Sequence, residues 1–166
     1  MSCLFLKKYR RKLHFRIPDW DQQLSISPCV LNHIVQHQQT SPFANEAGGQ
    51  LFARISPSCI SILRATGPRP TDHRTRYGYI PDHTKEQNEI NEMFKEGLLF
   101  IGDWHTHPQK IPSPSRSDQL SIRNVFRGSR HHLPALLLLI AGTEGFPAGL
   151  HLSFHSADTD IKLEPI

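Results

Sequence analysis

The sequence predicts one α/β (α+β) domain, a sandwich built on a mixed or largely antiparallel sheet. Three observations carry this prediction. The chain has 166 residues, which is the usual size of a single hydrophobic core. Strand-like segments with apolar residues at every second position are interspersed with segments that have a helical apolar stripe. The segment pairs within 50–65 and 135–155 have connections too short for a crossover helix, which favours antiparallel hairpins.

From the N-terminus, the first elements follow from their apolar patterns. Apolar and polar side chains alternate over 13–17, which predicts a half-buried strand. Ser27 followed by Pro28 is typical of a helix start, and an apolar stripe extends the predicted helix to about position 39. Two apolar runs at 50–55 and 59–65, joined by Ser-Pro-Ser, predict a hairpin.

A long loop and a second helix are predicted next. Residues 66–83 are too rich in proline, glycine and polar groups for a regular element, so we expect a loop that forms a candidate functional surface. Thr84 and Gln87 predict a capping box for a helix over 84–96, which a glycine ends. Four apolar residues then open a predicted buried strand over 98–107.

The last part of the chain contains a third predicted helix, at about 116–127, and two predicted strands, at 135–141 and 148–155. No apolar run in the sequence reaches the eighteen residues that a membrane-spanning helix needs. The N-terminus also lacks the apolar stretch and cleavage site of a secretory signal. We therefore expect a cytoplasmic protein without a membrane partner.

The positive charge of the chain is concentrated at its N-terminus. The formal net charge is +4, but six of the 19 lysines and arginines lie in residues 1–16, which contain no acid. The remainder carries 13 basic and 15 acidic side chains, and a slightly acidic surface disfavours nucleic-acid binding. We expect one domain over 1–166 with a basic arm at 1–12. A nucleic-acid adaptor that uses only this arm stays an alternative.

The segment that begins at His105 has the composition of a metal site. His105 and His107 are two residues apart at the end of a predicted strand, so both imidazoles face the same side. Pro108 ends strand pairing directly after them, and Asp118 lies in the first turn of a predicted helix. Two imidazoles and one carboxylate leave one tetrahedral position of a zinc ion open, as in catalytic sites. The ordinary alternatives are an exposed strand face and a helix cap, Ser115 with Asp118.

A hydrolytic site of this kind needs a proton acceptor for water, and Glu46 is the candidate. It is the only acidic residue between Asp21 and Asp72, and it precedes Ala-Gly-Gly and a predicted strand. The alternative is a solvated loop acid. His33 and His37 are four residues apart on a predicted helix, but no third ligand accompanies them, which favours a surface helix face over a second metal site.

These residues resemble the signature of the JAMM, or MPN-plus, metallopeptidases: an upstream glutamate, His-(Ser/Thr)-His-Pro and Ser-x-x-Asp. The separated parts of the motif occur in the right order, and the resemblance covers residues 10–156. It implies a cytidine-deaminase-like JAB/MPN fold, in which a curved mixed sheet is flanked by helices. It also implies Zn²⁺ bound by His105, His107 and Asp118, with Glu46 as the base and Ser115 as a donor to the oxyanion.

The stretch Gly-Pro-x-Pro-x-Asp-x-Arg-x-Arg-Tyr-Gly-Tyr at 67–79 is similar to short bacterial JAB-type peptidases of CBASS antiphage operons. The resemblance implies an isopeptidase or endopeptidase that removes a protein joined through its C-terminus to a target lysine. The conjugated protein would be the cyclic-oligonucleotide synthase of the operon, a nucleotidyltransferase. The alternatives are a ubiquitin-like protein of a related conjugation system and a non-catalytic MPN scaffold.

Substrate recognition is expected from the loop at 66–83 and from the residues before the histidines. Arg69, Arg74 and Arg76 are candidates to pair with carboxylates on an extended substrate tail, and the alternative is a solvated basic loop. Asp103 and Trp104 stand where eukaryotic members of the family usually carry Trp-Tyr. These two residues are therefore expected to shape the substrate groove.

Overall fold

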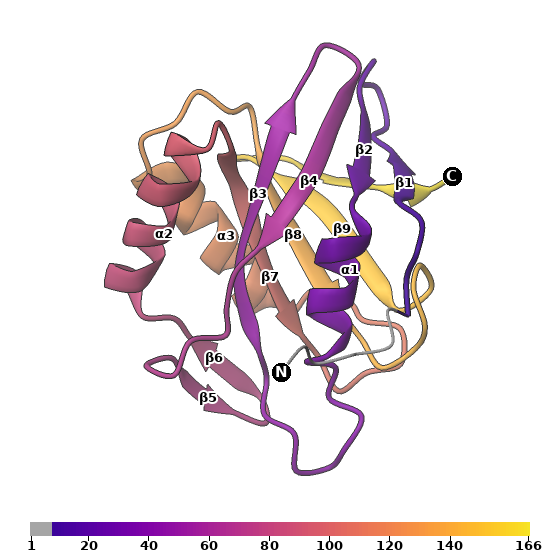
Figure 1. The fold of residues 1–166 in the computed structure, drawn as a ribbon, viewed down its shortest axis with the longest axis vertical. Helices are drawn as coiled ribbons and strands as arrows, with labels where there is room; N and C mark the ends of the chain where they lie inside the picture. Colours follow the sequence, from indigo (N-terminus) through magenta and orange to yellow (C-terminus); the bar gives the residue numbers. More distant parts are fainter. Residues whose placement is uncertain (1–7) are drawn as a thin grey trace, which may run out of the picture.

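The computed structural model describes residues 8–166, which form three helices, a curved nine-stranded sheet and a two-stranded ribbon (Figure 1). The helices are α1 (Pro28–Val35), α2 (His83–Lys95) and α3 (Arg116–Gly128). The strands are β1 (Leu13–Arg16), β2 (Gln23–Ile26), β3 (Gly48–Ile55), β4 (Cys59–Ala65), β5 (His73–Thr75), β6 (Gly78–Ile80), β7 (Leu99–Thr106), β8 (Leu136–Ala141), β9 (Leu150–His155), β10 (Asp160–Lys162) and β11 (Glu164–Pro165). Strand order in the large sheet is β10-β9-β8-β7-β3-β4-β2-β1-β11, and β5 pairs with β6.

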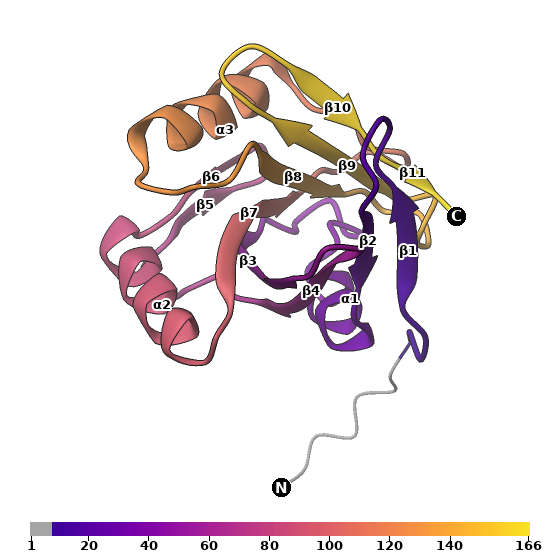
Figure 2. The same ribbon diagram turned by 90° about the horizontal axis from the view of Figure 1, so that it is seen from above.

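The two edges of the large sheet are joined by the chain itself. β10 and β11 lie at opposite ends of the strand order, yet only Leu163 separates them in sequence. The backbone N–H of Leu163 donates to the carbonyl of Leu152 at 3.0 Å. The sheet therefore curls until its ends meet, as Figure 2 shows from above, and this leaves little edge exposed to other chains.

The pairing is mixed, as the sequence predicts. β2 pairs with β4 and β7 pairs with β8 in parallel, whereas β3 with β4 and β8 with β9 form the expected antiparallel pairs. The parallel connection from β7 to β8 carries α3, because a parallel pair needs a crossover longer than a turn. The predicted fold class, a curved mixed sheet with flanking helices, is confirmed.

Two apolar clusters lie on opposite faces of β8. Leu137 and Leu139 belong to the larger cluster, which includes residues of α1 and of strands from both ends of the sheet, so it fills the enclosed face. Leu138 and Ile140 belong to a smaller outer cluster with Ile122 of α3. Because successive side chains of a strand alternate between faces, a strand covered on both sides is apolar throughout. Figure 2 shows α2 and α3 outside the curled sheet, on either side of β7.

The structure corrects several element boundaries. The first helix ends at Val35 rather than near 39, and the segment at 66–83 contains the β5–β6 hairpin instead of a loop alone. The N-cap of α2 is Asp82, whose carboxylate accepts from the backbone N–H groups of Thr84 and Lys85. An ionised carboxylate two residues earlier caps the helix dipole more strongly than the predicted Thr84 hydroxyl.

The basic arm predicted at 1–12 is described only from residue 8. Tyr9 stacks on Phe146 with ring centroids 5.2 Å apart, and its backbone exchanges two hydrogen bonds with the side chain of Asn32. The described part of the arm therefore lies against the domain, and the rest falls outside the described residues. Within residues 8–166, no helix is long and apolar enough to cross a membrane.

Candidate metal centre

β7 ends in two histidines whose rings point the same way. Both His105 and His107 lie on the outer face of the sheet, and their Nε2 atoms are 3.1 Å apart. His105 is in register with Ile140 of the outer cluster, while the intervening Thr106 points the other way and is fully buried. Period-two alternation thus brings the two imidazoles together, as the spacing in the sequence predicts.

Asp118 reaches the same point from the first turn of α3. The Ser115 hydroxyl oxygen accepts from the Asp118 N–H at 3.1 Å, and the Asp118 carboxylate accepts from the Ser115 N–H at 2.7 Å. The same carboxylate places Oδ1 3.4 Å from His105 Nε2 and Oδ2 3.3 Å from His107 Nε2. Asp118 can therefore take part in the cap of α3 and serve as a candidate metal ligand at the same time, because its reciprocal hydrogen bonds with Ser115 hold the carboxylate toward the histidines.

The spacing of these three side chains suits a tetrahedral ion. Zinc binds imidazole nitrogen and carboxylate oxygen at about 2.0–2.1 Å, so two ligands of a tetrahedral zinc lie about 3.3 Å apart. The observed separations are 3.1, 3.3 and 3.4 Å. Two imidazoles with one carboxylate are also a donor set that zinc accepts. The residues present fit a zinc ion with one open position.

Glu46 closes the site from the start of β3. One ligand atom each of Glu46, His105 and His107 lies within 4.8 Å of the others, and this group could hold a metal ion as well. Burial raises the pKa of Glu46, which is 8% exposed. Burial works in the same direction on Asp118, but hydrogen bonds from the two histidines outweigh it and hold the pKa of Asp118 well below its usual value. Two carboxylates with pKa values driven apart suit different roles, one as proton acceptor and one as ligand.

The backbone around Glu46 is fixed from two directions. The Glu46 N–H donates to the Thr75 carbonyl of β5, and Arg74 Nε donates to the Glu46 carbonyl, both at 2.7 Å. On the other side, the Ala47 N–H donates to the Thr106 hydroxyl at 2.9 Å, and the Thr106 N–H donates to the Ala47 carbonyl at 2.8 Å. The residue between the two histidines therefore holds the segment that carries the predicted base.

We expect Thr106→Val to destabilise this arrangement. Valine keeps the shape of threonine but removes the buried hydroxyl, which accepts from Ala47 and donates to Gln39 Oε1 at 3.0 Å. Both partners would stay buried without a hydrogen bond, so the free energy of unfolding should fall by about 2–4 kcal/mol. Thr106→Ser keeps the hydroxyl and should cost less than about 1.5 kcal/mol. Urea denaturation measures both, and equal losses would contradict the assigned role.

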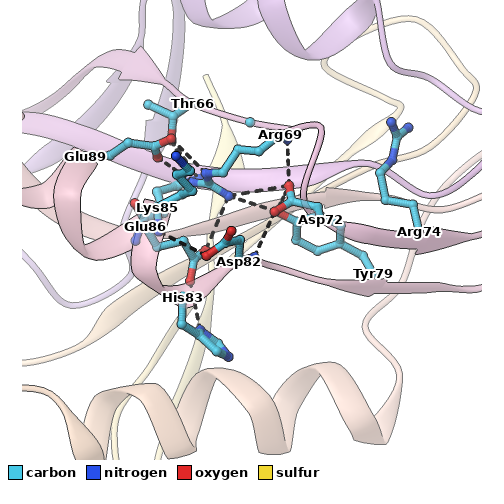
Figure 3. Close-up of polar contacts among 12 residues, drawn as sticks. Thr66, Arg69, Asp72, Arg74, Tyr79, Asp82, His83, Lys85, Glu86 and Glu89 are labelled. Carbon is cyan, nitrogen blue, oxygen red and sulfur yellow. Dashed lines mark hydrogen bonds and ion pairs between the residues drawn. The ribbon is translucent and has the colours of Figure 1, made fainter.

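Arg69 is turned inward and surrounded by acids (Figure 3). Its guanidinium donates to both carboxylate oxygens of Glu89, with Nε to Oε1 at 2.7 Å. It also lies 3.6 Å from the carboxylate of Asp72 and 3.7 Å from that of Glu86. These contacts tie the segment before β5 to α2, so Arg69 is a buried ion-pair residue. This corrects the expectation that it faces a substrate tail.

The other expected groove residues also bind the protein itself. Arg76 Nη1 donates to the backbone carbonyls of Ser41 and Pro42. Trp104 is 1% exposed, and its indole N–H donates to the Thr66 carbonyl at 2.8 Å. Alternation along β7 turns the Trp104 side chain into the enclosed core, although the residue is also among those that line the groove described next. Sequence patterns could not distinguish these internal partners from substrate groups.

A groove of about 1540 Å³ runs between α2 and α3 and contains the histidines and both carboxylates of the site. Asp103 lies on its floor, where burial, followed by the charge of Glu86, raises the pKa of Asp103 to about 8. Exposed apolar residues line the groove, including Tyr77, Ile80 and Phe94. An open cleft with a few polar groups near a candidate metal site suits an extended polypeptide.

Comparison with known proteins places the chain in a family. The model of the prokaryotic homologs of the JAB domain matches residues 28–148. Proteins named CD-NTase/cGAS isopeptidase are 27% identical in Escherichia coli (strain TW11681), over 75% of this chain and 80% of theirs, and 27% identical in Vibrio cholerae, over 72% and 76%. A probable metalloprotease of Sinorhizobium fredii is 37% identical over 61% of this chain and 66% of its own.

The fold itself also has a solved counterpart. The solution structure of protein DSY2949 from Desulfitobacterium hafniense superposes with a TM-score of 0.60 at 18% identity, over 85% of this chain and 88% of that one. This likeness concerns the fold alone. Since the family model spans most of the chain and the candidate metal group lies within the matched region, the chain belongs to the prokaryotic JAB-domain family of metalloproteases.

Proposed function

We propose that the protein is a zinc-dependent isopeptidase that releases a protein conjugated through its C-terminus, in bacterial antiphage defence. The observation that carries this proposal is the meeting of His105, His107 and Asp118 at tetrahedral spacing beside the buried Glu46. Several relatives are named CD-NTase/cGAS isopeptidase, which supports a nucleotidyltransferase as the conjugate. Such a substrate would be met in the cytoplasm.

The roles of the residues follow from their surroundings. His105, His107 and Asp118 would hold Zn²⁺, and the bound ion would supply a Lewis acid for the scissile carbonyl and for water. Glu46 takes the proton of the attacking water, because its raised pKa makes the carboxylate a stronger base. The protonated Glu46 later gives this proton to the leaving lysine amine. The Ser115 oxygen already accepts from the Asp118 N–H, so its O–H is free to donate to the developing oxyanion.

The test uses the zinc-loaded protein and two matched fusions. In one, the C-terminus of a CD-NTase is joined to a reporter protein, and in the other a ubiquitin-like protein takes its place. We expect cleavage after the CD-NTase, loss of cleavage after metal removal with a chelator, and recovery with one equivalent of Zn²⁺. Cleavage of only the second fusion would identify a ubiquitin-like conjugate. Absence of metal-dependent cleavage of either would contradict the peptidase assignment.

A further inference from the structure

Asp103 presents a carboxylate to the groove without a donor from the protein. It precedes His105 by two residues on β7, so both side chains project from the outer face, and two strand residues span about 6.6 Å. Within residues 8–166, neither a hydrogen bond nor an ion pair reaches the carboxylate of Asp103. Asp103 is half-buried, and a carboxylate that is partly withdrawn from water without a partner is costly. Such groups are found where a ligand supplies the missing contacts.

Gln50 faces Asp103 from the neighbouring strand. The two residues are paired in register on β3 and β7, which puts their side chains on the same face. Gln50 is 3% exposed, and its Oε1 atom is buried with no hydrogen-bond partner among the described residues. Both side chains line the groove. The floor of the groove therefore offers two sets of oxygen acceptors that the protein leaves unsatisfied.

The ion-pair cluster around Arg69, drawn in Figure 3, contains more acidic than basic side chains. The single guanidinium of Arg69 is shared among three carboxylates, those of Asp72, Glu86 and Glu89. The guanidinium of Arg69 makes two short contacts with the carboxylate of Glu89, whereas its Nη1 atom is 3.7 Å from Oε1 of Glu86. Of these three acids, Glu86 is the one that lines the groove. Its other partner is the exposed imidazole of His83, so Glu86 adds acceptor oxygens and negative charge beside Asp103.

We propose that Gln50, Glu86 and Asp103 form a subsite for an arginine side chain of the substrate, one or two residues from the scissile bond. A guanidinium carries five donors in a planar fork, so it can serve two carboxylates and one amide oxygen together. Lysine brings the same charge with a compact donor group and binds more weakly. Three protein ligands are too few for Ca²⁺, which takes six to eight oxygens.

The position follows from strand geometry and rests on the peptidase function proposed above. An extended substrate advances about 3.3 Å per residue, so the step from His105 to Asp103 corresponds to one or two substrate residues. The groove thus selects for basic residues, whereas the arginines at 66–83 suggest selection for acids. The groove therefore presents negative charge, whereas the arginines in the sequence of residues 66–83 suggest positive charge.

The test compares arginine with citrulline, which has the same shape and no charge. Internally quenched peptides with a central isopeptide bond carry one or the other at each of the two positions on either side of it. At one position, we expect the zinc-loaded protein to cleave the arginine peptide with a kcat/KM about tenfold higher. Asp103→Asn and Glu86→Gln should each bring this ratio to within about threefold. Glu92→Gln, on the exposed side of α2, should leave it at the wild-type value.

A binding measurement keeps the subsite and the peptidase function separable. Fluorescence anisotropy of the same peptides on zinc-loaded Glu46→Gln protein should show about tenfold tighter binding of the arginine peptide, lost when Asp103→Asn is added. Zinc content of every variant shows whether the metal centre is intact. Preferential binding of arginine without cleavage of any peptide would support the subsite and count against the peptidase. Equal binding and cleavage of arginine and citrulline peptides would overturn the subsite.

Discussion

Glu46→Gln should lower kcat/KM about 10³-fold and leave zinc bound. Glutamine has the size of glutamate but cannot accept a proton from water, and a positioned general base contributes about 10²–10⁴-fold. The three expected ligands keep their mutual contacts, since His105, His107 and Asp118 are held by one another and by the α3 cap. Peptidase assays and elemental analysis of zinc per chain measure the two effects separately.

Asp118→Asn is the matched control for that variant. Asparagine keeps an oxygen that can cap α3, so the helix start is retained, but it removes the charge that opposes the two imidazoles. We expect zinc to be lost together with activity. Because Glu46, His105 and His107 also form a possible metal group, the opposite outcome is informative. If Glu46→Gln loses zinc while Asp118→Asn retains it, Glu46 is the metal ligand and Asp118 the base. Full activity of Glu46→Gln would show that Glu46 is not the base.

Gly102→Ala should unfold the domain or destabilise it by more than about 4 kcal/mol. The backbone of Gly102 has φ +150°, and a Cβ there would lie 1.9 Å from the carbonyl oxygen of Leu137 and 2.6 Å from its nitrogen. Leu137 is the register partner of Gly102 in the parallel β7–β8 pair. Neither backbone atom can move without breaking that pair, and a clash of this kind belongs to the largest class of single-residue effects.

The same substitution at Gly128 provides the comparison. A Cβ at Gly128 meets nothing within 4 Å, and the residue lies in the last turn of α3. Gly128→Ala should therefore be neutral or stabilise the protein by up to about 1 kcal/mol. Urea denaturation gives the free energies of unfolding, and zinc content reports whether the end of β7 keeps its geometry. Similar stabilities for the two variants would show that β8 can yield at Leu137.

Long periodic elements were predictable from sequence because the pattern that defines them is local. The buried run of β8, the stripe of α3 and its Ser115–Asp118 cap are contained in fewer than fifteen residues each. β2, β10 and β11 have two to four residues each, which is too short for a period to show. β11 becomes a strand because Pro165 and Glu164 pair with β1, about 150 residues earlier. That pairing depends on the curl of the whole sheet.

In the metal centre, too, the features set by local geometry were predictable from the sequence, and those set by long-range contacts were not. The sequence by itself determined that His105 and His107 share a face and that Asp118 starts a helix, since strand and helix geometry act over a few residues. Only the tertiary structure decided that Glu46 meets them, through the hydrogen bonds between Ala47 and Thr106. It also decided the charge of the groove. The packing of elements decides which charged side chains meet. The acids of α2 that pair with the buried Arg69 could therefore be identified only once α2 was placed beside it.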